Sequence, residues 1–138
     1  MIRRAGPEDM EAVLDIRARV FIEEQGVSEE DERDGQDADA IHLIAFDGTR
    51  AVGTARLLLQ GDTGKIGRVA VLHDKRGTGL GKALIRAALE VLRAEGLTQA
   101  KLGSQTHAIG FYEGLGFVVT GPEFMDAGIP HRDMVLAL

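Results

Sequence analysis

The stretch that decides the fold runs from Lys65 to Leu84 and reads KIGRVAVLHDKRGTGLGKAL. Its first part, Ile66 to Leu72, is mostly apolar and rich in β-branched residues, which predicts a buried strand. A polar turn follows, and then a loop from Arg76 to Gly81 with glycine at every second position. From Leu80 onward, apolar residues recur at the i, i+3, i+4, i+7 spacing of one helix face, and Gly96 is placed to end that helix. The stretch therefore predicts a strand, a glycine loop and a long helix in succession.

The predicted loop is suited to binding an anion. The first amides of a helix lack partners within the helix, and the helix dipole places partial positive charge there. Glycines also let the backbone approach a ligand closely. Although the whole chain has a net charge of −6, the segment from Lys65 to Arg86 has six basic residues and only one acid, Asp74. This local reversal of charge favours a phosphate-binding loop.

Two well-known phosphate loops do not fit. A Walker A loop requires a hydroxyl residue after Gly81-Lys82 and a glycine five positions before Gly81, but Ala83 and Arg76 stand there. A dinucleotide fingerprint requires a third glycine at Lys82 or Leu84. A glycine-rich turn without a ligand, which any α/β domain can contain, remains the structural alternative.

One pattern fits at every position, namely Arg-x-x-Gly-x-Gly, carried by Arg76, Gly79 and Gly81. It resembles the acetyl-coenzyme A signature of the GNAT family of N-acetyltransferases, Gln/Arg-x-x-Gly-x-Gly/Ala. A second stretch resembles the family's C-terminal motif, Asn-x-x-Ala-x-x-Phe-Tyr-x-x-x-Gly-Phe. Its matching residues are Ala108, Phe111, Tyr112, Gly116 and Phe117, and Gln105 replaces the usual Asn. The segments 24–27 and 128–131 further resemble an uncharacterised bacterial subgroup of that family.

The resemblance implies an α/β fold over residues 1–138 as a single domain, with a mixed, mostly antiparallel sheet of about seven strands and helices on both faces. Strands are expected near residues 1–4, 41–46, 50–59, 66–72, 98–103, 117–120 and 131–138, with a long loop over 121–130. Helices are expected after Gly6-Pro7, from Leu80, and over residues 107–114. Gly67 inside the central strand predicts a bulge or a close backbone approach.

Two charged features have alternative interpretations. Arg17 lies on the apolar side of the first predicted helix, so we expect it either to reach solvent from an edge or to form part of a site wall. Residues 23–39 contain nine acids and one base, Arg33, and are expected to form a short helix plus loop, or a mobile flap. This acidic segment is either solvated surface or an electrostatic funnel for a cationic substrate.

Composition excludes several classes. The chain has 138 residues, no cysteine and no apolar run near the roughly 20 residues of a membrane span. Acidic net charge and few aromatic residues argue against a nucleic-acid partner. The four histidines lack metal-ligand spacing, so no metal is expected. The default expectation is a cytoplasmic protein without a membrane partner, and a homodimer is left open.

The resemblance implies acetyl-coenzyme A as the cosubstrate. The backbone from Arg76 through Gly77, Thr78, Gly79, Leu80 and Gly81 to Lys82 would hold the pyrophosphate. Val69, Ala70 and Val71 would pair with the pantetheine arm, with the Val71 amide polarising the thioester carbonyl, and Gln105 would make a further contact. An amine of a small molecule, peptide or protein would then attack the thioester directly.

The resemblance places Tyr112 at the family's general-acid position, although its ring could serve packing alone. The general base stays open among His42, Glu24, Glu23, His131 and Glu123. His42 is expected in a strand facing the site, and Glu23 or Glu24 could act through a water molecule. The alternative function is a non-catalytic module on the same fold that binds acyl-coenzyme A as a sensor or interaction domain.

Overall fold

The chain folds around one mixed sheet of eight strands, which the computed structural model describes over residues 1–138. The strands are β1 (Ile2–Arg4), β2 (Ile41–Asp47), β3 (Arg50–Gln60), β4 (Thr63–Val71), β5 (Gln99–Gln105), β6 (Val118–Val119), β7 (Phe124–Asp126) and β8 (Ile129–Ala137). Their order in the sheet is β1-β2-β3-β4-β5-β8-β6, and β7 pairs with β8. Only β4 and β5 run parallel, as the helical crossover between them predicts. The expected mostly antiparallel sheet is confirmed.

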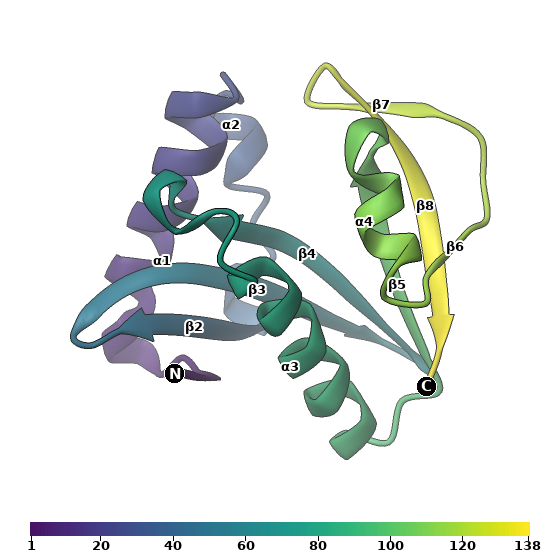
Figure 1. The fold of residues 1–138 in the computed structure, drawn as a ribbon, viewed down its shortest axis with the longest axis horizontal. Coiled ribbons are helices and arrows are strands. Elements are labelled where there is room, and N and C mark those ends of the chain that lie inside the picture. Colours follow the sequence, from purple (N-terminus) through teal and green to yellow (C-terminus); the bar gives the residue numbers. More distant parts are fainter.

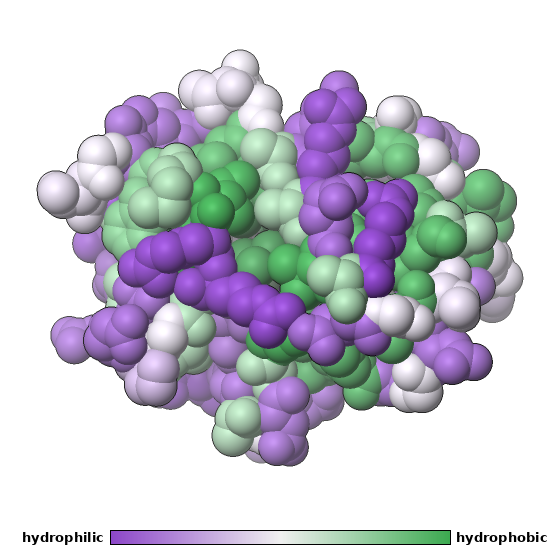
Figure 2. All heavy atoms as spheres, turned by 90° about the horizontal axis from the view of Figure 1, so that it is seen from below, coloured by the Kyte–Doolittle hydropathy of each residue, from purple (hydrophilic) through white to green (hydrophobic).

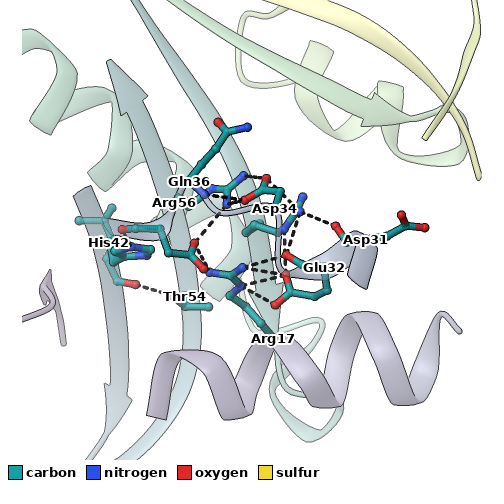
Figure 3. A network of polar contacts seen from close by, with 11 residues as sticks. Arg17, Asp31, Glu32, Asp34, Gln36, His42, Thr54 and Arg56 are labelled. Carbon is teal, nitrogen blue, oxygen red and sulfur yellow. Dashed lines mark hydrogen bonds and ion pairs between the residues drawn. The ribbon is translucent and has the colours of Figure 1, made fainter. Parts of the chain in front are cut away.

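Four α-helices accompany the sheet: α1 (Met10–Arg17), α2 (Glu29–Glu32), α3 (Leu80–Ala94) and α4 (Ile109–Glu113). A π-helical turn over Ala18–Glu24 extends α1, and short 3-10 turns precede α1, β2, α3 and α4. Thr54 and Arg56 of β3 point toward α1, whereas Gly53 lies beneath the leucines of α3 (Figures 1 and 3). Successive strand residues face opposite sides, so α1 and α3 cover the two faces of the sheet.

The position of α3 depends on glycines. Gly79 (φ 85°) and Gly96 (φ 80°) adopt the left-handed conformation at its two ends. The apolar stripe between them packs on β3 and β4, and it buries Leu84, Ile85, Ala88, Leu89 and Leu92. A Cβ atom at Gly64 would collide with Leu92, so glycine there lets the helix lie close to the sheet.

One expected loop contains a strand. Residues 121–130 include β7, which pairs with β8 from Phe124↔His131 to Asp126↔Ile129. The two-residue turn between them, Ala127 (φ 51°) and Gly128 (φ 76°), has positive φ at both positions. Such turns normally begin with Asn, Asp or Gly. Because alanine stands at the first position, the sequence pattern did not predict a hairpin here. This is why the sheet has eight strands instead of about seven.

The sheet opens between β4 and β5. They pair only from Thr63↔Gln99 to Lys65↔Lys101 and then separate. Figure 1 shows the resulting V, with β4 on one arm and β5 with β8 on the other. In β4, Gly67 pairs with Arg56 and Ala70 with Thr54, so two residues lie opposite one. The predicted irregularity at Gly67 is therefore confirmed as a bulge beside this opening.

Buried charges connect α1, α2 and the sheet (Figure 3). The arginine cluster, as we call it, contains Arg17, Arg56, Arg68, Glu32, Asp34 and Asp37. Arg17 is completely buried, and its Nη2 and Nη1 donate to Glu32 and Asp37 at 2.7 Å each. It therefore does not reach solvent, and the sequence-based expectation of an edge residue is wrong. Although burial opposes its charge, hydrogen bonds to Glu32 and Asp37 raise the pKa of Arg17.

The cluster also organises the acidic segment. Arg56 makes a two-pronged contact with Asp34 at 2.8 Å for each oxygen, and Arg68 joins Glu32 to Asp34. The hydrogen bond from Arg56 holds the pKa of Asp34 far below its usual range. The short helix expected in residues 23–39 is present as α2, with Ser28 as its cap. A purely solvated surface is thus wrong for Glu32, Asp34 and Asp37.

The remaining surface is mixed. The face shown in Figure 2 has apolar atoms near its centre with charged side chains among and around them. The most exposed large apolar side chains are Met1, Leu59, Phe111, Val118, Phe124 and Met125. None of the helices is both long and apolar enough to span a bilayer.

We predict that Arg17→Met lowers the free energy of unfolding by about 3–5 kcal/mol, because it leaves the carboxylate of Glu32 buried with reduced compensation. The measurement is urea denaturation followed by circular dichroism. The matched control is Arg19→Met, which removes an exposed helical ion pair with Asp15 and should cost at most about 1 kcal/mol. Equal losses in the two variants would contradict a structural role for the cluster.

Candidate active site

The opening between β4 and β5 contains a cavity of about 480 Å³. Its walls come from the end of α1 and the α2 segment on one side, and from β5, α4, β7 and β8 on the other. Lys65, Arg68 and Val69 of β4 line it, as do Gln105, Tyr112 and His131 from the opposite arm. Residues from five separate parts of the sequence therefore meet in one concave site.

The glycine loop follows β4 on the first arm of the V and leads into α3 (Figure 1). Gly77 (φ 76°) and Gly79 (φ 85°) adopt backbone conformations that favour glycine. A Cβ atom at Gly81 would have no neighbour closer than 3.9 Å, so the space above the start of the helix is open. The unpaired first amides of α3 and the exposed Lys82 border this space. The loop therefore leaves room for an anionic group beside the start of α3, and its binding of such a group stays a prediction.

Several of the basic side chains around the loop are already paired with acids, so fewer are free to bind a ligand than the sequence suggests. Arg76 donates to Glu24 at 2.7 Å and to the carbonyl of Val71 at 3.1 Å. Lys75 pairs with Asp47, and Arg68 belongs to the arginine cluster. Lys82 makes no ion pair and remains available to a ligand phosphate.

The strand residues before the loop have different orientations. Val69 lines the cavity, whereas the side chain of Ala70 is buried in the core at 1% exposure. Val71 packs near Gly81 and follows the bulge at Arg68–Val69. The Val69–Val71 backbone therefore forms the edge of the open arm, where an extended ligand could lie along it.

Tyr112 lies on α4 and lines the cavity. Its ring makes edge contacts with Phe111 and Phe117, with centroids 5.1 and 6.0 Å apart. Burial raises the pKa of Tyr112, so its hydroxyl stays protonated at neutral pH. That hydroxyl makes no hydrogen bond within the protein. It can therefore donate to a group in the cavity.

Two contacts connect the end of the α1 segment to both arms of the V. Glu24 binds Arg76 after β4, and the side-chain oxygen of Gln25 accepts a hydrogen bond from Gln105 of β5 at 3.0 Å. The other side of the Gln105 amide contacts His107 at 2.7 Å. We call the Glu24–Arg76 and Gln25–Gln105 contacts the cross-arm bridge. It engages two residues that the sequence assigned to ligand binding.

His42 and Glu24, two residues predicted to be catalytic, do not line the cavity. His42 is buried behind the arginine cluster, its Nε2 lies 2.9 Å from the carbonyl of Asp37, and its Nδ1 has no partner. The expectation that this strand histidine faces the site is wrong, because it points toward the 3-10 turn Asp37–Asp39 instead. Glu24 is engaged with Arg76. Of the three predicted catalytic residues, the cavity contains only Tyr112.

The structure brings in residues that sequence analysis missed or did not favour. Arg56 and Arg68 line the cavity, and a charged residue inside the apolar run Val52–Leu59 was the available signal for Arg56. His131 lines the cavity from β8, which its place in an alternating strand did not reveal. No three His, Asp or Glu side chains converge to hold a metal ion.

Comparisons with known proteins agree with this geometry. Residues 7–138 match the sequence model of the acetyltransferase (GNAT) domain. Uncharacterised protein YyaT of Bacillus subtilis (strain 168) is 42% identical over 126 residues, covering 89% of this chain and 85% of YyaT. The uncharacterised N-acetyltransferase YjcF of the same strain is 33% identical, covering 93% and 92%.

A solved structure extends the likeness to three dimensions. The crystal structure of an acyl-CoA N-acyltransferase from Pseudomonas aeruginosa has a TM-score of 0.88 and 29% identity, and the match covers 99% of this chain and 97% of that one. The glycine loop, the parted strands and the matched family domain agree with one another. This chain therefore belongs to the GNAT family of acetyltransferases and is an acyltransferase enzyme.

Proposed function

We propose that this enzyme transfers an acetyl group from acetyl-coenzyme A to a primary amine, by direct attack in a ternary complex. The observation that supports this most is the opening between β4 and β5, whose cavity has Tyr112 in its wall and whose first strand leads into the glycine loop. Family membership supports the acyl donor. The P. aeruginosa relative, whose name specifies acyl-CoA, supports it as well.

The donor would bind along the first arm. The backbone from Arg76 to Lys82 would hold the pyrophosphate at the start of α3, where the dipole favours an anion. The Val69–Val71 backbone at the strand edge would pair with the pantetheine arm, and an amide there would stabilise charge on the thioester oxygen. Gln105 would contact the donor from the second arm once its hydrogen bond to Gln25 is broken.

Tyr112 would act as the general acid. The departing thiolate must gain a proton, and a hydroxyl whose pKa is raised by burial stays protonated until that moment. The chain has no cysteine to form an acyl-cysteine intermediate, which is consistent with direct attack by the amine.

The acceptor would be an amine of a small molecule, peptide or protein. The arginine cluster neutralises three of the nine acids in residues 23–39, which weakens the proposed funnel for a cation. Asp31, from the same segment, still lines the cavity as an exposed carboxylate, together with the exposed Asp126 and the half-buried Asp133. An amine that is protonated in solution is thus attracted to this side of the site.

We predict that Gly79→Val abolishes binding of acetyl-coenzyme A and amine-dependent release of its thiol, because a β-branched residue at φ 85° distorts the loop. Calorimetry and a thiol assay over a broad amine panel measure the two effects. Gly96→Val is the control, since it strains the other end of α3 at φ 80° and should keep both activities.

The wild-type result decides between functions. Thiol release with at least one amine supports the acetyltransferase. Saturable binding without release for any amine would favour the non-catalytic acyl-coenzyme A module, and no binding would contradict both.

We predict that Glu24→Gln tightens acetyl-coenzyme A binding several-fold, because the Glu24 carboxylate competes with the pyrophosphate for Arg76. Calorimetry at low salt measures the affinity. Glu23→Gln removes the same charge from the neighbouring exposed position, which makes no ion pair, and is the control. Weaker binding in Glu24→Gln would mean that Glu24 helps to hold the donor.

We predict that Tyr112→Phe lowers turnover about ten- to a thousand-fold while the acetyl-coenzyme A affinity stays unchanged, because only the proton donor is lost. Single-turnover kinetics would measure the chemical step directly. Unchanged single-turnover rates would reduce Tyr112 to a packing residue.

A further inference from the structure

His131 occupies a central place in the second arm of the V. In the sheet it pairs with Gln105 of β5 on one side and with Phe124 of β7 on the other. It is 9% exposed and lines the same cavity as Tyr112. The histidine thus shares one site with the proposed general acid.

Contacts of the ring define its protonation pattern. Nδ1 lies 2.7 Å from the carbonyl oxygen of Ile129, which can only accept a hydrogen bond. Nδ1 therefore carries the hydrogen, and in the neutral ring the lone pair is on Nε2. Phe124 stacks on the ring with centroids 5.8 Å apart and fixes its plane. Nε2 makes no hydrogen bond within the protein. Unlike Nδ1 of His42, which is buried without a partner, it is not completely enclosed by protein atoms. Nε2 therefore has accessible surface, on a residue that lines the cavity.

The rival bases are less suited. His42, Glu23, Glu24 and Glu123 do not line the cavity. Glu32 does, but its carboxylate is 1% exposed and already binds two guanidinium groups, from Arg17 and Arg68.

We infer that His131 is the general base of the acetyl transfer, with Nε2 taking the first proton from the acceptor ammonium. This inference rests on the proposed function. The titratable groups that line the cavity around His131 are Asp126, Asp133, Tyr112, Lys65, Arg56, Arg68, Asp31, Glu32 and Asp34. Because carboxylates and guanidinium groups both occur there, the pH profile must be assigned by substitution.

The acceptor nitrogen loses two protons in the reaction. The ammonium gives one proton to Nε2 of His131, which passes it to solvent. The freed amine forms the new C–N bond, and the C–S bond breaks as Tyr112 protonates the departing thiolate. The second proton on the attacking nitrogen then restores the Tyr112 hydroxyl. The products are the acetamide, the free thiol and one proton in solvent.

The decisive variant is His131→Asn, whose amide can still donate to Ile129 in place of Nδ1 but has no counterpart of Nε2. We expect turnover to fall about 10²–10⁴-fold, with acetyl-coenzyme A affinity unchanged. The pH profiles of the wild type and the variant should differ, because without the base the reaction depends on acceptor amine that has already lost its proton in solution. His131→Gln serves as a second variant if the first does not fold.

His42→Gln is the matched control and should keep the wild-type turnover and pH profile. A readout independent of activity is the ¹⁵N NMR spectrum of the histidines, in which His131 should be protonated on Nδ1 and not on Nε2 in its neutral form. The opposite tautomer would overturn the inference.

The kinetic outcomes separate the two levels of proposal. If the wild type acetylates amines and His131→Asn keeps its turnover and pH profile, the role of His131 fails while the acetyltransferase function stands. If the wild type binds acetyl-coenzyme A but acetylates no amine, the proposed function fails, and the base role fails with it.

Discussion

The candidate site depends on one constraint, which is that β4 and β5 share only three residue pairs before they separate. A continuous sheet would satisfy the backbone groups of both strands and leave no opening. Here β3 continues along β4, and β8 continues along β5, so each arm keeps one paired neighbour while the inner edges remain open. The open edges can be used by a ligand backbone, which is how a sheet can bind an extended acyl carrier.

Buried charge shapes the first arm. The arginine cluster spans α1, β3, the bulge in β4 and the segment around α2, and its ion pairs replace the hydration that Arg17, Arg56 and Glu32 lose on burial. A well-packed apolar contact could stabilise the fold equally. The guanidinium forks, however, specify where the acidic segment lies, because each pairs with carboxylates in a defined geometry. Glu32, Asp34 and Asp37 are therefore structural, and Asp31 lines the cavity without belonging to the cluster.

The chemistry divides between the two arms. The first arm supplies the glycine loop and the strand edge, which suit an anionic, extended donor. The second arm supplies Tyr112 from α4 and His131 from β8, which suit proton transfer. The cross-arm bridge connects the arms through Glu24 and Gln25. Under the proposed function, a donor would exchange these contacts for its own, which would couple donor binding to the geometry of the opening.

The sequence by itself determined the order of every strand except β7, the glycine loop, the long helix and the family, because these rest on local periodicity, glycine positions and short motifs. It also marked the bulge through Gly67. The β7 hairpin was not predicted, because its turn contains Ala127 in a positive-φ conformation that alanine rarely adopts. Only the tertiary structure decided that Arg17 is buried, that His42 faces Asp37 and that His131 faces the cavity. The physical reason is that strand alternation limits a side chain to one of two faces, whereas the packing of distant segments decides what each face meets.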